Sequence, residues 1–243
     1  GSAPLKFTAG TNLTTPEAGA LEYDGTNLYF TNGGGRHTLA FTDSNITGTA
    51  ANGTLFAYGV VVHSSSATTS SGSLTINGTS CGTGTSSRGI FLYNNANVSS
   101  TGSGNVTITG IAANGTDYAK GVLIRNSSCV TSNSGSLTIN GTSCGTGTNP
   151  KGIYLRFSSN ITSTGSGNVT ITGITANQSG TGIQLFSSSV KVASNGGLIT
   201  LTANSMNLAG TVNATTSGSV TIRTLGLGIN LGNGTDTPAN LGI

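Results

Sequence analysis

Charge is scarce in this chain: Asp, Glu, Lys and Arg make up 6% of its 243 residues. Disordered chains stay solvated through high charge or many prolines, and this sequence, with 4 prolines, has neither. It lacks any apolar run of about 18 residues, the length that a membrane-spanning helix requires. No segment carries apolar residues at helical spacing without interruption by glycine or β-branched residues. The sequence therefore predicts neither disorder, nor a helix of useful length, nor membrane insertion.

Residues that carry catalysis are equally rare. Between residues 59 and 225 the one acidic residue is Asp117. Hydrolases and lyases built on β-helices need paired carboxylates or a basic cluster around a metal. His37 and His63 have no cysteine or acidic neighbour at the spacing of metal ligands. We therefore expect a protein without catalytic residues, cofactor or metal, and not an enzyme.

What the chain does contain is a repeat. It has 39 glycines, and its Ser, Thr and Asn separate alternating Val, Ile and Leu, a pattern typical of short strands joined by tight turns. Residues 152–176 read GIYLRFSSNITSTGSGNVTITGITA, residues 89–113 are nearly the same, and residues 121–144 are a variant with the same skeleton. A segment that returns at a fixed period is one structural unit copied along the chain.

Three lines of apolar residues recur in each copy. The first line follows a glycine, as in Ile153 and Leu155, the second holds single residues such as Val130, and the third holds pairs such as Val106 and Ile108. Three short strands per coil of about 30–32 residues, with a constant phase of inward residues, predict an all-β fold, a right-handed parallel β-helix or β-solenoid. Neighbouring coils would lie about 4.8 Å apart.

The same alignment predicts the state of the 3 cysteines. It places Cys81, Ala113, Cys144, Ala176 and Met206 in one inward column. Cys81 and Cys144 would then be two coils, or about 9.6 Å, apart, whereas a disulfide needs Cα atoms within about 7 Å. We expect three free thiols that act as small core residues.

Three segments are expected along the chain. Residues 1–58 form an N-terminal hairpin and cap, with two strands in LEYDGTNLYFT on either side of the turn at residues 24–27. Residues 59–225 form the β-helix, whose open first coil the cap would cover. Residues 226–243 are a truncated repeat or tail that leaves the last coil open, and open strand edges favour pairing with other copies of the chain.

Two stretches resemble known proteins. The coils with GIxL…NITSxGSGNVTITG, and LTANSMNLAGTVNATTSGSVTIRTLGLGINLGNGTDTPANLGI from residue 201 onward, resemble filamentous-haemagglutinin-like secreted adhesins and giant β-strand-repeat bacterial surface proteins. This resemblance covers about residues 59–243. Within residues 1–48, TTPEAGALEYDGTNLYFTNGGGRHTLAFTD resembles linker modules of phage tail fibres and large surface proteins. The resemblance implies a secreted or cell-surface fibre without cofactor or catalytic residues.

The outward positions of the first strand form a candidate binding stripe that mixes aromatic and basic side chains. Its members are Phe91, Tyr93, Arg125, Tyr154, Arg156 and Phe186. Aromatic faces suit sugar rings, but a loop, a tail or a neighbouring subunit could equally cover such a stripe. Beside it, Arg88, Lys120 and Lys151 precede the coil glycine and should stack in a column. Either these side chains extend into solvent, or they form an electropositive edge for anionic glycans or lipopolysaccharide.

Threonine marks the outward face of the third strand. We expect two outward columns there, a T-x-T or T-x-N array that resembles the ice-binding faces of β-helical antifreeze proteins. Its threonines are Thr75, Thr107, Thr109, Thr138, Thr170, Thr172, Thr200 and Thr202. The plainer explanation is that threonine suits the pleated strand, and that stacked hydroxyls pair along the sheet.

These observations favour a non-enzymatic segment of a bacterial surface or secreted fibre, which extends the fibre and adheres. The alternatives are a phage tail-fibre segment and an ice-binding module. Glycans, or other copies of the chain, are the expected partners, and no nucleic acid is expected.

Overall fold

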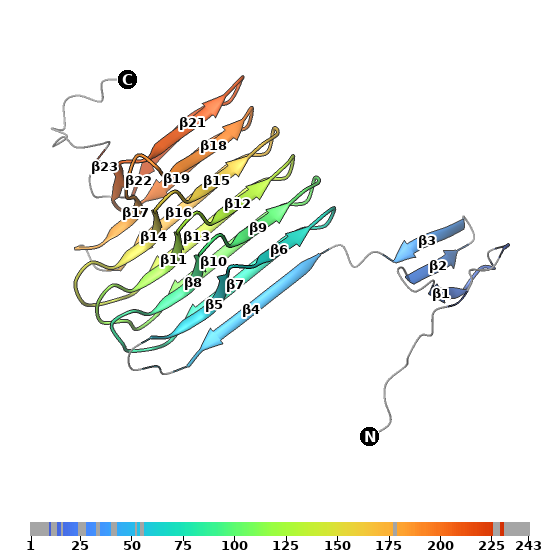
Figure 1. Cartoon of the computed structure of the whole chain (residues 1–243), viewed down its shortest axis with the longest axis horizontal. Coiled ribbons are helices and arrows are strands. Elements are labelled where there is room, and N and C mark those ends of the chain that lie inside the picture. The colour runs from blue at the N-terminus through green and yellow to red at the C-terminus, as the bar shows by residue number, and fades with distance from the viewer. Residues whose placement is uncertain are drawn as a thin grey trace. The chain divides into compact units, whose positions relative to one another are not determined.

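The computed structural model describes residues 10, 14–15, 17–23, 28–32, 35–39, 43–51, 53, 56–176, 179–225 and 229–230. The chain divides into two compact units, Gly1–Thr42 and Asp43–Ile243. All regular structure in the described ranges is β-strand (Figure 1). No helix in those ranges is long and apolar enough to cross a membrane.

The first unit holds a small antiparallel sheet with strand order β1-β2-β3. Its strands are β1 (Leu21–Tyr23), β2 (Leu28–Asn32) and β3 (Gly35–Leu39). The pairing of Tyr23 with Leu28 confirms the predicted hairpin, although the turn at residues 24–27 lies outside the described residues. The strand β3 was not predicted, because GRHTL lacks the alternation of apolar and polar residues that marks a strand.

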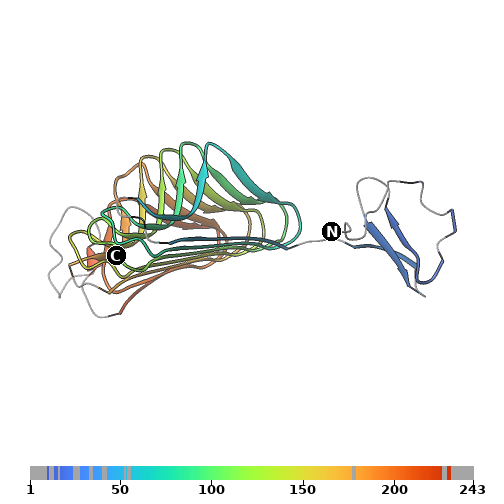
Figure 2. The same ribbon diagram turned by 90° about the horizontal axis from the view of Figure 1, so that it is seen from below.

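The second unit is a parallel β-solenoid with three sheets, as predicted. A complete coil contributes one strand to each sheet. Figure 2 shows the coils stacked one behind another. We name the sheets by their outward residues or strand length. The threonine sheet contains β4 (Ser44–Ala50), β7 (Leu74–Ser80), β10 (Val106–Ala112), β13 (Leu137–Ser143), β16 (Val169–Thr175), β19 (Ile199–Ala203) and β22 (Val220–Thr224).

The other two sheets follow in each coil. The aromatic sheet contains β5 (Tyr58–His63), β8 (Arg88–Tyr93), β11 (Lys120–Arg125), β14 (Lys151–Arg156), β17 (Thr181–Leu185), β20 (Met206–Leu208) and β23 (Ile229–Asn230). The short-strand sheet contains β6 (Ser66–Thr69), β9 (Asn97–Ser100), β12 (Cys129–Ser132), β15 (Asn160–Ser163), β18 (Lys191–Asn195) and β21 (Thr211–Thr215).

Alternate residues of each strand point into the solenoid and form one continuous core. In β10, Val106 and Ile108 are fully buried while Thr107 between them is partly exposed. The predicted inward residues of the three lines occupy this core, except on β22, where Ile222 is only partly buried. Val220 of β22 is 40% exposed, because β22 pairs only with β19 and is the last described strand of its sheet.

The repeated glycines let two sheets approach backbone to backbone. A Cβ atom built on Gly110 of β10 would lie 2.2 Å from the carbonyl oxygen of Gly121 in β11. One built on Gly89 of β8 would lie 2.2 Å from the backbone nitrogen of Ile111. Real Cβ atoms cannot approach so closely, so only glycine fits at this crossing. The coil glycine of the repeat is therefore a packing requirement.

The corners that follow β5, β8, β11 and β14 use the left-handed backbone region. Asn94 and Asn126 adopt φ values of 54° and 55° there, and asparagine tolerates this conformation better than most residues. The Asn126 amide nitrogen donates to the Asn94 side-chain oxygen at 3.0 Å, and Asn94 lies 3.1 Å from His63 Nε2. The third copy has Phe157 at this corner with φ 54°, an uncommon conformation for a bulky residue.

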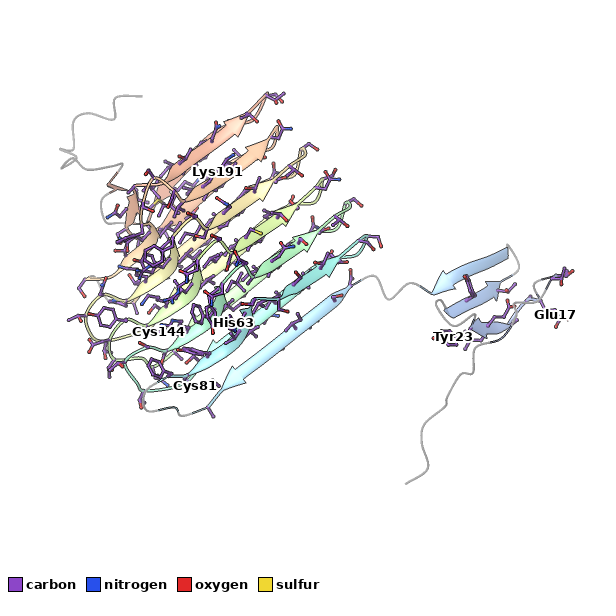
Figure 3. The ribbon with its side chains drawn as sticks, viewed as in Figure 1. Glu17, Tyr23, His63, Cys81, Cys144 and Lys191 are labelled. Carbon is purple, nitrogen blue, oxygen red and sulfur yellow. The ribbon has the colours of Figure 1, made fainter. Side chains whose placement is uncertain are left out.

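The prediction that Cys81 and Cys144 point into the core is wrong. Ser80 and Ser143 point inward and are fully buried, so Cys81 and Cys144, the next residues, are half-buried at the surface of the solenoid (Figure 3). Met206 does not share that column at all, because it lies in the aromatic sheet opposite Ile183. The coil after Leu201 is shorter than the others, and the alignment of the longer coils does not carry over. All three cysteines are free, as predicted.

The solenoid also starts earlier than the sequence indicated. The strand β4 begins at Ser44 and pairs in parallel with β7, so part of the expected N-terminal segment belongs to the first coil. Most of the predicted tail, residues 226–243, lies outside the described residues. The prediction that this tail leaves the last coil open therefore also falls outside the described residues.

Candidate binding surface

The outer face of the aromatic sheet carries a second buried cluster, separate from the core. Phe91, Leu123 and Tyr154 are register partners on β8, β11 and β14. They alternate with core residues and so point away from the solenoid interior, as predicted. Yet their exposed fractions are only 6%, 2% and 6%. Neighbouring aromatic and basic side chains on the same face cover them, so an outward position is not here an exposed one.

At the first coils, aromatic rings cover this face. The rings of Phe91 and Tyr93 stack with centroids 4.3 Å apart, and His63 stacks on Tyr93 at 4.0 Å. Tyr58 lies 5.6 Å from Phe91 in a tilted arrangement. The predicted stripe members Phe91 and Tyr93 therefore form one continuous aromatic layer with residues of the preceding coil.

Two arginines lie over that layer. The Arg88 guanidinium is 4.5 Å from the Phe91 centroid and 4.8 Å from that of Tyr58. Arg125 lies 5.6 Å from the Phe91 centroid. Cations within about 6 Å of a ring face are attracted by its negative quadrupole. These contacts explain how a net-cationic face holds together without carboxylates.

At the later coils, the cations gather around one ring. The Lys151 ammonium, the Arg156 guanidinium and the Lys120 ammonium lie 5.5, 5.5 and 5.9 Å from the Tyr154 centroid. Arg156 is also 3.8 Å from the centroid of Phe157 and 5.4 Å from that of Phe186. The other three predicted stripe members, Tyr154, Arg156 and Phe186, thus belong to one cluster.

The lysine column stacks as predicted but does not extend into solvent. Arg88, Lys120 and Lys151 are register partners on successive coils, and Lys120 and Lys151 are only 6% and 5% exposed. The Lys120 ammonium donates to the Tyr118 carbonyl oxygen at 2.6 Å. Lys151 donates to the Asn149 side-chain oxygen at 2.5 Å. The hypothesis of solvated side chains on a copied turn is therefore wrong.

Burial makes these cations costly. It lowers the pKa of Lys120 to about 7, and the nearby charges of Arg88, Lys151 and Arg156 act in the same direction. Burial likewise lowers the pKa of Lys151. Desolvation disfavours a charged amine unless an anion lies beside it. Throughout the described residues, no carboxylate forms an ion pair with either lysine.

A hollow of about 190 Å³ opens beside these cations. Its lining consists of Tyr118, Lys120, Asn149, Lys151, Tyr154, Arg156, Gln184 and Phe186. Two further hollows of about 240 Å³ lie next to Cys144 and along the short-strand sheet, and neither has an aromatic side chain in its lining. We call the hollow around Lys120 and Lys151 the cation pocket.

Two side chains of the cation pocket have unused hydrogen-bonding capacity. Arg156 Nε and Gln184 Oε1 are buried and have no hydrogen-bond partner. Buried polar atoms are normally satisfied, but Arg88 Nε and Arg125 Nε on the same face are unpaired too, so the Arg156 atom does not distinguish the pocket. In the parts of the chain that the structure describes, no three His, Cys, Asp or Glu side chains gather as they would around a metal.

Comparisons with protein-family models, with curated proteins and with solved structures find no match to this chain.

The predicted threonine columns are in register. Thr107 pairs with Thr75 on one side and Thr138 on the other, and the column continues through Thr170 and Thr200. The second column aligns Thr109, Thr172 and Thr202 with asparagines of the alternate coils. These side chains are partly exposed and point outward. Arg223 follows Thr202 in that second column.

Sequence reasoning missed part of the cation pocket. Tyr118, Asn149 and Gln184 come from two loops and from β17, and nothing in their local sequence marks them as site residues. The two lysines had a visible signal, since each precedes a coil glycine. That signal indicated the column but not its burial, because burial depends on side chains from neighbouring coils.

Proposed function

We propose that this chain is a non-enzymatic segment of an extracellular bacterial fibre, and that the outer face of its aromatic sheet binds glycans. The observation that supports the proposal most is the concentration of aromatic and cationic side chains on one face of a solenoid otherwise coated with Ser, Thr and Asn. The resemblance of the repeats to secreted adhesins also supports an extracellular fibre.

The face has both parts that a saccharide site requires. Buried members such as Phe91 and Tyr154 form a rigid base, while Tyr118, Phe157 and Phe186 are 51%, 44% and 47% exposed. Exposed aromatic rings offer flat apolar area, and the surrounding Arg and Lys groups offer hydrogen-bond donors for hydroxyls. The buried base lies on β8 and β14, and the three exposed rings lie just before β11 and directly after β14 and β17.

A glycan array tests the proposal. We expect binding by the wild-type chain that is lost in the double variant Tyr93→Ala with Arg156→Ala. The matched control is Thr138→Ala with Arg223→Ala, which removes one arginine from the threonine sheet and should leave binding unchanged. Absence of any glycan bound by the wild type, or equal loss in both variants, would refute this function.

A second candidate function is ice binding. The aligned threonine columns form a regular array of outward hydroxyls on the threonine sheet. If this face binds ice, the protein should shape growing ice crystals, and Thr138→Tyr should abolish the effect. Unshaped ice in the presence of the wild-type chain would exclude this activity.

A further inference from the structure

The cation pocket has a chemical character of its own within the aromatic face. Three cationic side chains, Lys120, Lys151 and Arg156, border a hollow that also has Tyr118 and Phe186 in its lining. We propose that the pocket binds a sugar residue bearing an acidic group, carboxylate or sulfate, with that group held by the two lysines and Arg156. This inference rests on the proposed glycan-binding function and specifies its ligand.

Charge balance supports an anionic ligand. Two ammonium groups and a guanidinium surround the Tyr154 ring within 6 Å, and the described chain supplies no carboxylate to them. The nearest acid in sequence, Asp117, accepts hydrogen bonds from the Thr148 backbone nitrogen and hydroxyl at 2.7 and 3.0 Å. Buried charges without a partner are destabilising, and an anion in the pocket would relieve this cost.

Hydrogen-bonding capacity supports the same ligand. A lysine ammonium has three donors, and each of these lysines donates once to the protein, Lys120 to Tyr118 and Lys151 to Asn149. The remaining donors are free for the oxygens of a carboxylate or sulfate. Arg156 and Gln184, with one unbonded atom each, offer a donor and an acceptor from side chains that line the pocket.

The size and rim of the pocket fit one sugar residue. Pockets for drug-sized ligands measure about 300–1,000 Å³, so a hollow of about 190 Å³ accepts something smaller. Tyr118 and Phe186 are half-exposed at its rim. Their rings can contact the apolar face of a pyranose while its acidic group reaches the lysines.

The aligned position one coil earlier is built differently. There the register partner of Lys120 is Arg88, and its guanidinium lies over the rings of Tyr58 and Phe91. Those two rings flank the Arg88 guanidinium, whereas the Lys120 and Lys151 ammonium groups border the hollow. An ammonium is a compact point charge with three donors, which suits the oxygens of an anion.

Binding should also depend on pH. With its pKa lowered to about 7, Lys120 must take up a proton when an anion binds above that pH, so affinity falls as the pH rises. The charged and titratable groups that face Lys120 are Arg88, Tyr118, Lys151, Tyr154 and Arg156.

The experiment is calorimetric titration at pH 6 with three galactose-based oligosaccharides: oligogalacturonate, a sulfated galactan oligomer and the neutral galactan oligomer. We expect binding of at least one charged oligomer and much weaker binding of the neutral one. Lys120→Met and Lys151→Met should each weaken it about ten- to a hundredfold, the usual effect of losing a hydrogen bond to a charged group. The control is Lys191→Met on β18 of the short-strand sheet, an exposed lysine (Figure 3).

The outcomes separate the two proposals. Binding of a charged oligomer that the pocket variants lose and Lys191→Met retains supports the acidic-sugar site, and the oligomer bound identifies carboxylate or sulfate. Equal binding of the neutral oligomer, lost in Phe186→Ala but kept in Lys151→Met, would overturn the acidic-sugar site and leave the glycan-binding function intact. Equal weakening by Lys191→Met would show a general charge effect and also overturn the site. Circular dichroism of each variant confirms its fold.

Discussion

Lys120 of β11 and Lys151 of β14 are register partners on adjacent coils, and both are buried on the outer face of the same sheet. The repeat places two like charges side by side, and neighbouring side chains, among them Tyr118 and Tyr154, remove them from water. Buried, uncompensated lysines reduce stability. An anion bound in the adjacent hollow, as proposed above, would relieve this cost.

The stability of the solenoid should rise with pH between about 7 and 10.5. The folded chain holds Lys120 with a pKa of about 7, against an ordinary value of 10.5, so in this window the unfolded chain binds more protons. The free energy of unfolding then increases by up to about 1.4 kcal/mol for each pH unit. Below pH 7 both states are protonated, and the full cost of the buried charge remains.

Urea unfolding at several pH values between 6 and 9 measures this effect. Lys120→Met should reduce the rise of the unfolding free energy with pH, and it should raise stability at pH 6. A double variant with Lys151→Met should reduce the slope further, since burial lowers the pKa of Lys151 too. Lys191→Met should leave the slope unchanged. A wild-type stability that falls over this range would contradict the assignment.

Replacing Ile108 by Asp should destabilise the solenoid by roughly 3 kcal/mol or more, since it buries an unpaired charge where an apolar residue packs. Replacing Thr107, its partly exposed neighbour on β10, by Asp should cost less than about 1 kcal/mol. Thermal and urea unfolding of the pair measure the difference. Equal destabilisation of both variants would mean that the inward phase of β10 is wrong.

Replacing Gly110 by Ala should destabilise the solenoid by about 1–3 kcal/mol, the usual cost of overpacking. The new methyl group would lie 2.2 Å from the Gly121 carbonyl oxygen, so the threonine and aromatic sheets must separate locally. Gly10→Ala is the control, because a Cβ there meets nothing within 4 Å. A neutral Gly110→Ala variant would show that the crossing is looser than described.

Denatured, unreduced protein should react with about three equivalents of a thiol reagent per chain, because its three cysteines are free. In the native protein Cys129 should react most slowly. Burial raises its pKa, its thiol donates to the Asn97 side-chain oxygen at 3.3 Å, and the thiolate is the reactive form. Mass spectrometry after brief labelling measures the order, and fastest labelling at Cys129 would contradict it.

The sequence by itself determined the solenoid. Its copies place Ile108, Ile139 and Ile171 at the same position of the repeat, and the period of two within each strand separates inward from outward residues. In a structure where each coil pairs with the next copy of itself, alignment of the copies is alignment in space. Strand register, the core and the threonine columns could therefore be predicted from the residues alone.

The alignment failed where the repeat changes. Met206 belongs to a shortened coil and lies in the aromatic sheet opposite Ile183, and no regular period predicts that shift. Cys81 was placed inward although the alternation that begins at Leu74 and Ile76 gives it the outward parity, and β7 keeps that alternation to its end. Ser80 is the last inward residue there.

Only the tertiary structure decided the candidate site. The alternation along β14 indicates that Tyr154 points outward, but its exposure depends on side chains from the coils before and after it. Tyr118 and Gln184 join the cation pocket from a loop and from the next coil, a combination that exists only once the coils stack. Alternation would group Lys151 with the inward residue Ile153, yet its ammonium lies beside outward Tyr154. The packing of long side chains across coils decides both where such a group lies and whether water reaches it.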